Sequence, residues 1–169
     1  MKKTKEIFIY VVDNDPLFLQ DFKDSFSLDR GYTLYTFSSV QKFLSNMRER
    51  NDNKLSIVII NDMIISHGLN TKSVVEILPM IKNIDKDISV IVLTDSDNRE
   101  LKLSSSDLRP DAFIKNDKML YFKLPPTINR IVCRYNLKKS KQNLHISAII
   151  AVAVIIITIA YMATASIIG

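Results

Sequence analysis

IFIYVVDNDP, residues 7–16, carries the clearest structural signal in the chain. Its first six residues are apolar and rich in β-branched and aromatic side chains, which predicts a buried strand over Ile7–Val12. The polar triplet that follows predicts a loop, and Pro16 suits the first turn of a helix. Three phenylalanines at four-residue spacing then mark one helical face, at positions 18, 22 and 26. The stretch therefore predicts a strand, a polar loop and a helix, in that order.

The same unit recurs along the chain up to residue 137. Apolar residues at helical spacing predict helices around 40–47 and 74–81, a weakly patterned helix over 98–108, and a last helix that begins after Pro125-Pro126. Alternating strands and helices favour a flavodoxin-like, doubly wound α/β fold with a five-stranded parallel sheet, which we expect over residues 1–137. The four further strands are predicted at Tyr32–Phe37, Ile57–Ile60, Ile88–Leu93 and Asp111–Ile114.

Residues 146–169 differ in composition from everything before them. They include no charged residue, no proline and no glycine before Gly169, whereas all 41 charged residues of the chain lie at or before Lys141. As a helix this stretch would extend about 36 Å, which exceeds the roughly 30 Å hydrocarbon core of a bilayer. Its position at the C-terminal end excludes a signal peptide. We therefore predict one C-terminal transmembrane helix over residues 146–169.

A change in charge precedes this helix. Residues 1–117 carry 16 basic and 18 acidic side chains, whereas residues 118–169 carry seven basic and none acidic. Residues 138–145 form a basic juxtamembrane segment, and basic flanks favour the cytoplasmic side of a membrane. We expect a single-pass protein of the inner (cytoplasmic) membrane with its N-terminal domain in the cytoplasm. The membrane-flanking basic residues are Arg130, Arg134, Lys138, Lys139 and Lys141.

Polar residues follow the predicted strands at the point where each one ends. In doubly wound sheets ligands bind beyond the carboxyl ends of the strands, which all meet at one edge. Carboxylates, a hydroxyl and an amine therefore converge there. The residues in question are Asp13, Asn14, Asp15, Asn61, Asp62, Thr94 and Lys115.

Five segments in order carry a resemblance to a known family: IFIYVVDNDPLFL, YTLYTFSSVQKFL, IVIIND, SVIVLTD and DAFIKND. Over about residues 6–135 the chain resembles the response-regulator receiver domain of two-component signalling. The resemblance implies a site in which an acidic pair after the first strand holds Mg²⁺ and an Asp after the third strand accepts phosphate. It also implies that a Thr or Ser after the fourth strand and a Lys after the fifth contact the phosphoryl group.

The sequence departs from that pattern at two positions. Asp13 matches the first acid, but Asn14 stands where the main metal-binding Asp is expected and Asn61 where the phosphate acceptor is expected. Thr94 and Lys115 match their positions. Mg²⁺ needs negatively charged oxygen ligands and phosphate transfer needs a nucleophilic carboxylate, and an amide provides neither. We expect a degenerate phosphorylation pocket that has no catalytic residue, needs no cofactor and pairs Lys115 with Asp13.

One alternative reading of the pocket stays open. Asp15 and Asp62 each lie one residue beyond an asparagine, so a shift of one residue in both loops would make Asp62 the phosphate acceptor. Asp13, Asp15 and Asp62 would then form the Mg²⁺ site of an active receiver. The alternation of side chains along a strand argues against this shift, because adjacent residues point to opposite faces.

The favoured function is a membrane-anchored pseudo-receiver that acts by protein–protein interaction, without enzymatic activity or phosphorylation. Its expected partners are the bilayer and a signalling protein such as a histidine kinase or a membrane complex. One alternative is the active phosphorelay receiver. Another is a structural subunit of a membrane assembly, in which small residues of the span make contacts: Ala153, Ala160 and Thr164.

Nucleotide and nucleic-acid ligands are not expected. The basic run before the span lacks interleaved aromatic residues and any recognition motif for nucleic acid. The chain has only three glycines and none in the first loop, which argues against a dinucleotide-binding loop. The acidic first loop would repel the phosphate of FMN.

Overall fold

A computed structural model of the chain describes residues 7–26, 31–50, 54–62, 74–95 and 109–168. The chain divides into two compact units, Met1–Ile131 and Val132–Gly169, which we describe separately. The helix predicted over residues 98–108 lies outside the described residues, and so do the side chains of Ala160 and Thr164.

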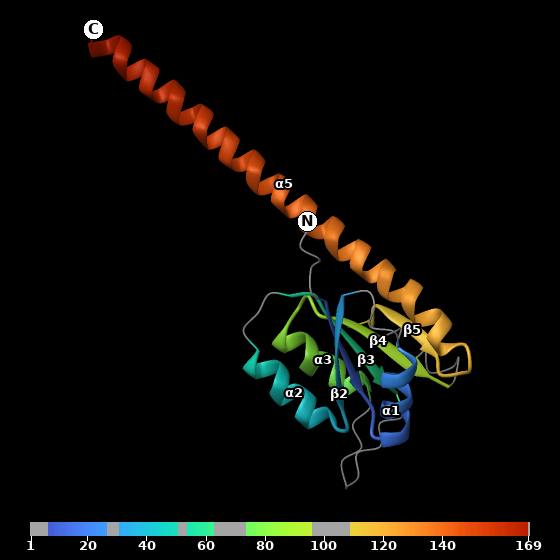
Figure 1. Cartoon of the computed structure of the whole chain (residues 1–169). Helices are drawn as coiled ribbons and strands as arrows, with labels where there is room; N and C mark the ends of the chain where they lie inside the picture. The colour runs from blue at the N-terminus through green and yellow to red at the C-terminus, as the bar shows by residue number, and fades with distance from the viewer. Residues whose placement is uncertain (1–6, 27–30, 51–53, 63–73, 96–108, 169) are drawn as a thin grey trace. The chain divides into compact units, whose positions relative to one another are not determined.

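The first unit contains a five-stranded parallel sheet in the order β2-β1-β3-β4-β5 (Figure 1). This order is that of the flavodoxin-like doubly wound fold, so the predicted fold class is confirmed. Every residue of the interior strand β1 is buried, as expected for a parallel strand covered on both faces. The strands are β1 (Ile7–Val12), β2 (Tyr32–Phe37), β3 (Ser56–Asn61), β4 (Ser89–Thr94) and β5 (Ala112–Lys115).

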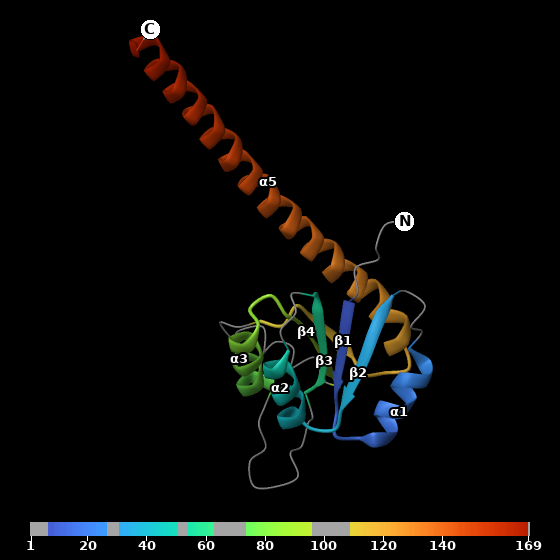
Figure 2. The same cartoon turned by 60° about the vertical axis from the view of Figure 1, so that its left-hand side comes forward.

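Helices cover the two faces of this sheet (Figure 2). On one face α2 (Val40–Glu49) and α3 (Val74–Ile84) pack their apolar sides against alternate strand residues. This core removes apolar side chains of five separate elements from water. Such burial is the dominant favourable term in folding. The core includes Phe8, Tyr10, Val12, Phe43, Val58, Ile60, Ile77, Leu78, Val90 and Val92.

On the other face α1 (Pro16–Ser25) packs against the first turns of α5 (Leu120–Ile168). The rings of Phe22 and Tyr121 meet edge to face at 5.8 Å between centroids. The Tyr121 hydroxyl donates a 2.6 Å hydrogen bond to Oδ2 of Asp21. Burial, and next the Asp21 carboxylate bonded to it, raise the pKa of Tyr121. These contacts fix the start of α5 to α1.

The expectation that Pro125-Pro126 precede the last helix is wrong. The helix α5 begins at Leu120 and contains both prolines. Each proline removes one backbone donor, which usually disfavours a helix interior. Here buried residues on both sides of the prolines hold the backbone helical, and Thr127 Oγ1 donates to the carbonyl of Lys123 at 2.9 Å. The buried residues are Leu120, Leu124, Ile128 and Ile131.

The second unit is a helix by itself, the part of α5 from Val132 onward. Among the described residues α5 is the one helix that is long and apolar enough to cross a membrane. Its most apolar window is not buried against any other part of the described chain, so it is not a core helix. One long apolar C-terminal helix could therefore cross a membrane, as the sequence predicts.

Candidate functional site

The carboxyl edge of the sheet brings together a carboxylate and an amide from two adjacent strands. Asp13 follows β1 directly and is only 2% exposed, and Asn61 is the last residue of β3. Because Val12 is paired with Ile60 in the ladder, the next residue of each strand lies opposite the other. Asn61 Nδ2 donates a 2.9 Å hydrogen bond to Asp13 Oδ2. The backbone N–H of Asp15 donates to the other oxygen, Oδ1, at 2.8 Å.

This pairing decides which end of the Asn61 amide faces Asp13. An amide offers a donor at one end and an acceptor at the other, whereas an ionised carboxylate only accepts. With Nδ2 toward Asp13 the contact is a hydrogen bond, and with the oxygen there it would place two acceptors against each other. Asn61 therefore presents a hydrogen-bond donor at the place where the family resemblance predicts the phosphate acceptor.

The residues at this edge do not fit Mg²⁺. The ion prefers near-octahedral oxygen ligands and is usually held in proteins by one or two carboxylates together with substrate phosphates. Here the one carboxylate of the predicted pocket, Asp13, already accepts two N–H bonds, and its neighbours Asn14 and Asn61 are neutral. Within the described part of the chain, no three His, Cys, Asp or Glu side chains form a group that could hold a metal ion.

The two acids of the alternative reading lie in different surroundings. Asp15 is exposed and is the N-cap of α1, where its Oδ1 accepts a 2.9 Å bond from the backbone N–H of Leu17. That bond satisfies one of the free donors at the helix start. Asp62 continues the ladder by donating its backbone N–H to the carbonyl of Leu93 at 2.9 Å, and both of its carboxylate oxygens are buried. Asp15 is therefore an exposed capping residue, whereas Asp62 is a carboxylate with buried oxygens next to Asn61.

Thr94 and Lys115 end two neighbouring strands and are paired in the ladder. Thr94 is buried, whereas Lys115 is exposed. Among the described residues no ion pair joins Lys115 to Asp13, so the expected pairing is not found. Lys115 is exposed, whereas the buried Asp13 carboxylate accepts hydrogen bonds from Asn61 and from the backbone of Asp15. The charge of Lys115 acts on Asp117 instead. The pKa of Asp117 is lowered mainly by its hydrogen bond from Lys123, and the positive charge of Lys115 is one of the smaller causes.

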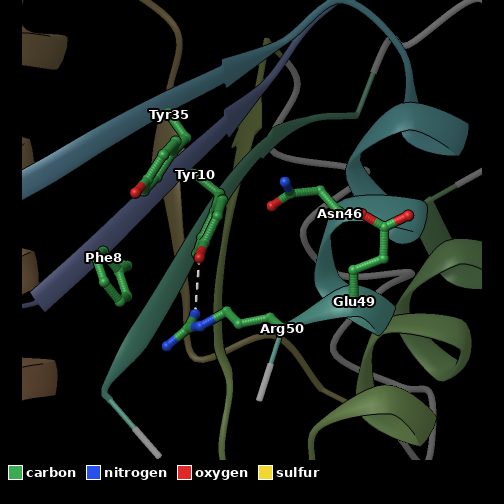
Figure 3. Close-up of a pocket in the computed structure, with 6 residues that line it drawn as sticks. All are labelled: Phe8, Tyr10, Tyr35, Asn46, Glu49 and Arg50. Carbon is green, nitrogen blue, oxygen red and sulfur yellow. Dashed lines mark hydrogen bonds between the residues drawn. The ribbon is translucent and has the colours of Figure 1, made fainter. Parts of the chain in front are cut away.

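A second polar cluster, which sequence reasoning missed, lies around Arg50 (Figure 3). Arg50 follows the last residue of α2, and its Nη1 donates to the Tyr10 hydroxyl at 2.7 Å and also to Ser56 Oγ. Its Nη2 donates to the carbonyl of Lys54 at 3.2 Å. The guanidinium carbon also lies 4.5 Å from the centre of the Phe8 ring. Arg50 therefore joins the end of α2 to β1 and β3 by hydrogen bonds and a cation–π contact.

An open pocket of about 240 Å³ lies beside this cluster. Figure 3 shows aromatic side chains of β1 and β2 on one side and polar side chains from α2 on the other. Tyr35 is 40% exposed and stacks on Tyr10 with 5.3 Å between ring centroids. No motif in the sequence marks Arg50, because a single arginine after a helix is typical of any solvated helix end. The lining residues are Phe8, Tyr10, Tyr35, Asn46, Glu49 and Arg50.

Comparison with known proteins places the fold. No protein-family model matches the sequence, and no curated protein matches it. Solved structures do match. A response-regulator receiver domain from Clostridium thermocellum is 24% identical with a TM-score of 0.63, over 78% of this chain and 98% of that one. A CheY-like receiver domain from Methanospirillum hungatei JF-1 is 17% identical with a TM-score of 0.62, over 78% and 97%.

A third similar structure is the BeF₃-activated receiver domain of DrrB, a Thermotoga maritima protein. It is 24% identical with a TM-score of 0.56, over 74% of this chain and 96% of that one. Each of these three domains is matched along nearly its whole length, and the long C-terminal part of α5 is what this chain has in addition. The N-terminal part of the chain therefore has the fold of response-regulator receiver domains.

Proposed function

We propose that the protein is a membrane-anchored pseudo-receiver, a signalling module that binds a partner protein and does not accept phosphate. The observation that carries this proposal is the 2.9 Å hydrogen bond from Asn61 Nδ2 to Asp13 Oδ2. A receiver that accepts phosphate needs a carboxylate at the position of Asn61 and a second one at the position of Asn14. Both positions hold amides, which are not nucleophiles for phosphoryl transfer.

The same hydrogen bond supports a pocket that is stable without Mg²⁺. An uncompensated buried carboxylate is costly, and in this chain amide and backbone donors satisfy Asp13 in place of a cation. The bond also links the ends of β1 and β3. Partner binding by such a module does not depend on the addition of a phosphoryl group.

The exposed apolar part of α5 supports the anchoring half of the proposal. The proposed arrangement has the first unit in the cytoplasm, because the basic residues before the span favour that side. The single cysteine, Cys133, is exposed and lies before the span. We expect the Cys133 thiol to react with a membrane-impermeant maleimide in inside-out membrane vesicles and not in intact spheroplasts. Labelling in intact spheroplasts alone would contradict this orientation.

Phosphate acceptance can be tested on the full chain in detergent or nanodiscs. The chain is incubated with acetyl phosphate and Mg²⁺, and intact mass measures any added phosphoryl group. We expect none on the natural sequence, and we expect one on the Asn14→Asp/Asn61→Asp variant, which restores the family pattern. Addition to the natural sequence that is lost in Asp62→Asn would overturn the proposal in favour of an active receiver with Asp62 as acceptor.

A further inference from the structure

The basic residues of the second unit form a compact group just before the apolar part of α5. Lys138, Lys139 and Lys141 are all exposed. The chain has no acidic residue from position 118 to its end, so no intrahelical carboxylate pairs with them. Lys139 Nζ lies 5.9 Å from the ring of Tyr135, one turn earlier on the same helix. The group is therefore a concentrated positive charge with no carboxylate on its own helix.

The spacing of these lysines along the helix matches the depth of a lipid headgroup layer. At about 1.5 Å per residue, they lie roughly 7–12 Å before Ile146, where the uncharged stretch begins. That distance is close to one Debye length, about 8 Å at physiological ionic strength. Arg134 and Arg130 lie about 18 Å and 24 Å before Ile146 on the same scale, where screening removes most of the attraction.

The three lysines also spread around the helix. Successive residues of an α-helix are about 100° apart, so Lys139 and Lys141 project about 100° and 60° from Lys138 in opposite directions. The ammonium groups therefore cover almost half of the helix circumference at nearly one depth. A single acidic patch on a partner protein would meet only one side of such a helix, whereas a plane of headgroups surrounds it.

We propose that Lys138, Lys139 and Lys141 form a binding site for the headgroups of anionic phospholipids. This inference rests on the proposed membrane anchoring and adds a lipid preference to it. Flexible lysine side chains reach toward the phosphates while their alkyl stems lie along the helix. Each lysine close to the surface favours anionic over neutral lipid about fivefold. The protein would therefore gather anionic lipids around its span.

The test uses the full chain labelled at Cys133 with a fluorescent donor and reconstituted into vesicles of phosphatidylcholine with a minor share of phosphatidylglycerol. Energy transfer is measured to acceptor-labelled phosphatidylglycerol and, separately, to acceptor-labelled phosphatidylcholine at the same mole fraction. We expect transfer to phosphatidylglycerol to exceed transfer to phosphatidylcholine, and the excess to disappear in 1 M salt, where the Debye length is about 3 Å.

Two double variants that each remove two positive charges distinguish binding at these lysines from a general effect of net charge. Lys138→Gln/Lys141→Gln should remove most of the excess, whereas Arg130→Gln/Arg134→Gln should keep most of it. Equal transfer to the two lipids by a chain that floats with the vesicles and resists carbonate extraction would overturn the lipid site alone. A chain that is extracted by carbonate would contradict the membrane anchor as well. Equal losses in both double variants would also overturn the assignment to these lysines.

Discussion

Two buried polar side chains, one within strand β1 and one directly after it, accept hydrogen bonds from different kinds of donor. Asp13, just after the strand, accepts a neutral amide donor from Asn61, 48 residues further along the chain. Tyr10, in the middle of the strand, accepts a charged donor from Arg50, 40 residues further along. Both groups are 2% exposed, so each needs a partner inside the protein. An anion is matched with an amide, and a neutral hydroxyl with a cation.

The two clusters differ in how many elements each one links. Around Tyr10 the guanidinium also bonds to Ser56 and contacts the Phe8 ring, so one side chain links two strands and a helix. Around Asp13 the amide provides one hydrogen bond where the receiver pattern requires a reactive carboxylate. We therefore expect the Arg50 cluster to be important for stability, and the Asp13 pair to carry the proposed inability to accept phosphate.

The largest expected effect is that of Arg50→Ala. The variant removes hydrogen bonds from a charged donor together with a cation–π contact, so we expect the free energy of unfolding to fall by about 3 kcal/mol. Urea unfolding measures the change. Arg48→Ala, which removes the same charge from an exposed position in the last turn of α2, should stay within about 0.5 kcal/mol of the natural protein. Equal effects of the two variants would show that the Arg50 contacts do not stabilise the fold.

Asn61→Asp should have the next largest effect. The change replaces a donor by a partly buried carboxylate beside Asp13, so we expect a loss of about 2 kcal/mol in EDTA. Millimolar Mg²⁺ should recover part of that loss, because the cation offsets the added charge. Asn46→Asp, at an exposed position of α2, provides the control and should respond little to either condition. A stable Asn61→Asp protein in EDTA would mean that the hydrogen bond from the Asn61 amide is not needed to stabilise Asp13 in the folded state.

Tyr121→Phe tests a third polar contact, in which the Tyr121 hydroxyl bonds directly to the Asp21 carboxylate. The variant removes the hydrogen bond to Asp21 and should cost about 1 kcal/mol near neutral pH. Because the folded state raises the pKa of Tyr121 above its ordinary value of 10.0, its stabilising contribution is complete below pH 10 and is lost as pH rises further. Between pH 8 and 11 the free energy of unfolding should therefore decline less steeply with pH in the variant than in the natural protein. Parallel curves would contradict the contact.

The smallest effect is expected from Asp117→Asn. The hydrogen bond from Lys123 is the first cause that lowers the pKa of Asp117 in the folded state below its ordinary value of 3.8. A carboxyl with a lowered pKa stabilises the fold above its ordinary pKa, and this contribution is lost as pH falls through the lowered value. Acid unfolding should therefore be slightly less steep in the variant below pH 4. An unchanged acid transition would show that the exposed contact contributes nothing measurable.

Much of the fold follows from local patterns in the sequence. The apolar run at Ile7–Val12 coincides with β1, because a strand buried on both faces has no polar residue within it. The β-branched and aromatic residues of Tyr32–Phe37 likewise coincide with β2, a partly exposed strand at the edge of the sheet. The apolar faces of α2 and α3 follow from apolar residues at helical spacing. The two prolines of α5 could not be placed correctly, since local propensity disfavours them in a helix and only long-range packing keeps them there.

The candidate site was predictable only where strand order determines it. The positions of Asp13 and Asn61 follow from the parallel register of β1 and β3, which brings the ends of both strands to one edge. The orientation of the Asn61 amide and the exposed position of Lys115 depend on the hydrogen bonds that form in three dimensions. A local sequence pattern does not predict those bonds. Arg50 has no signal in the sequence, because its partners are Tyr10 of β1, Ser56 of β3 and the carbonyl of Lys54 before that strand.

The central claim is that amides at positions 14 and 61 prevent the receiver edge from binding a phosphoryl group. Fluorine NMR of the full chain with Mg²⁺ and beryllofluoride tests it directly, because an adduct gives bound signals that differ from those of the free fluoroberyllates. The account predicts only free signals for the natural sequence and bound signals for Asn14→Asp/Asn61→Asp. Bound signals from the natural sequence that disappear in Asp62→Asn would contradict it.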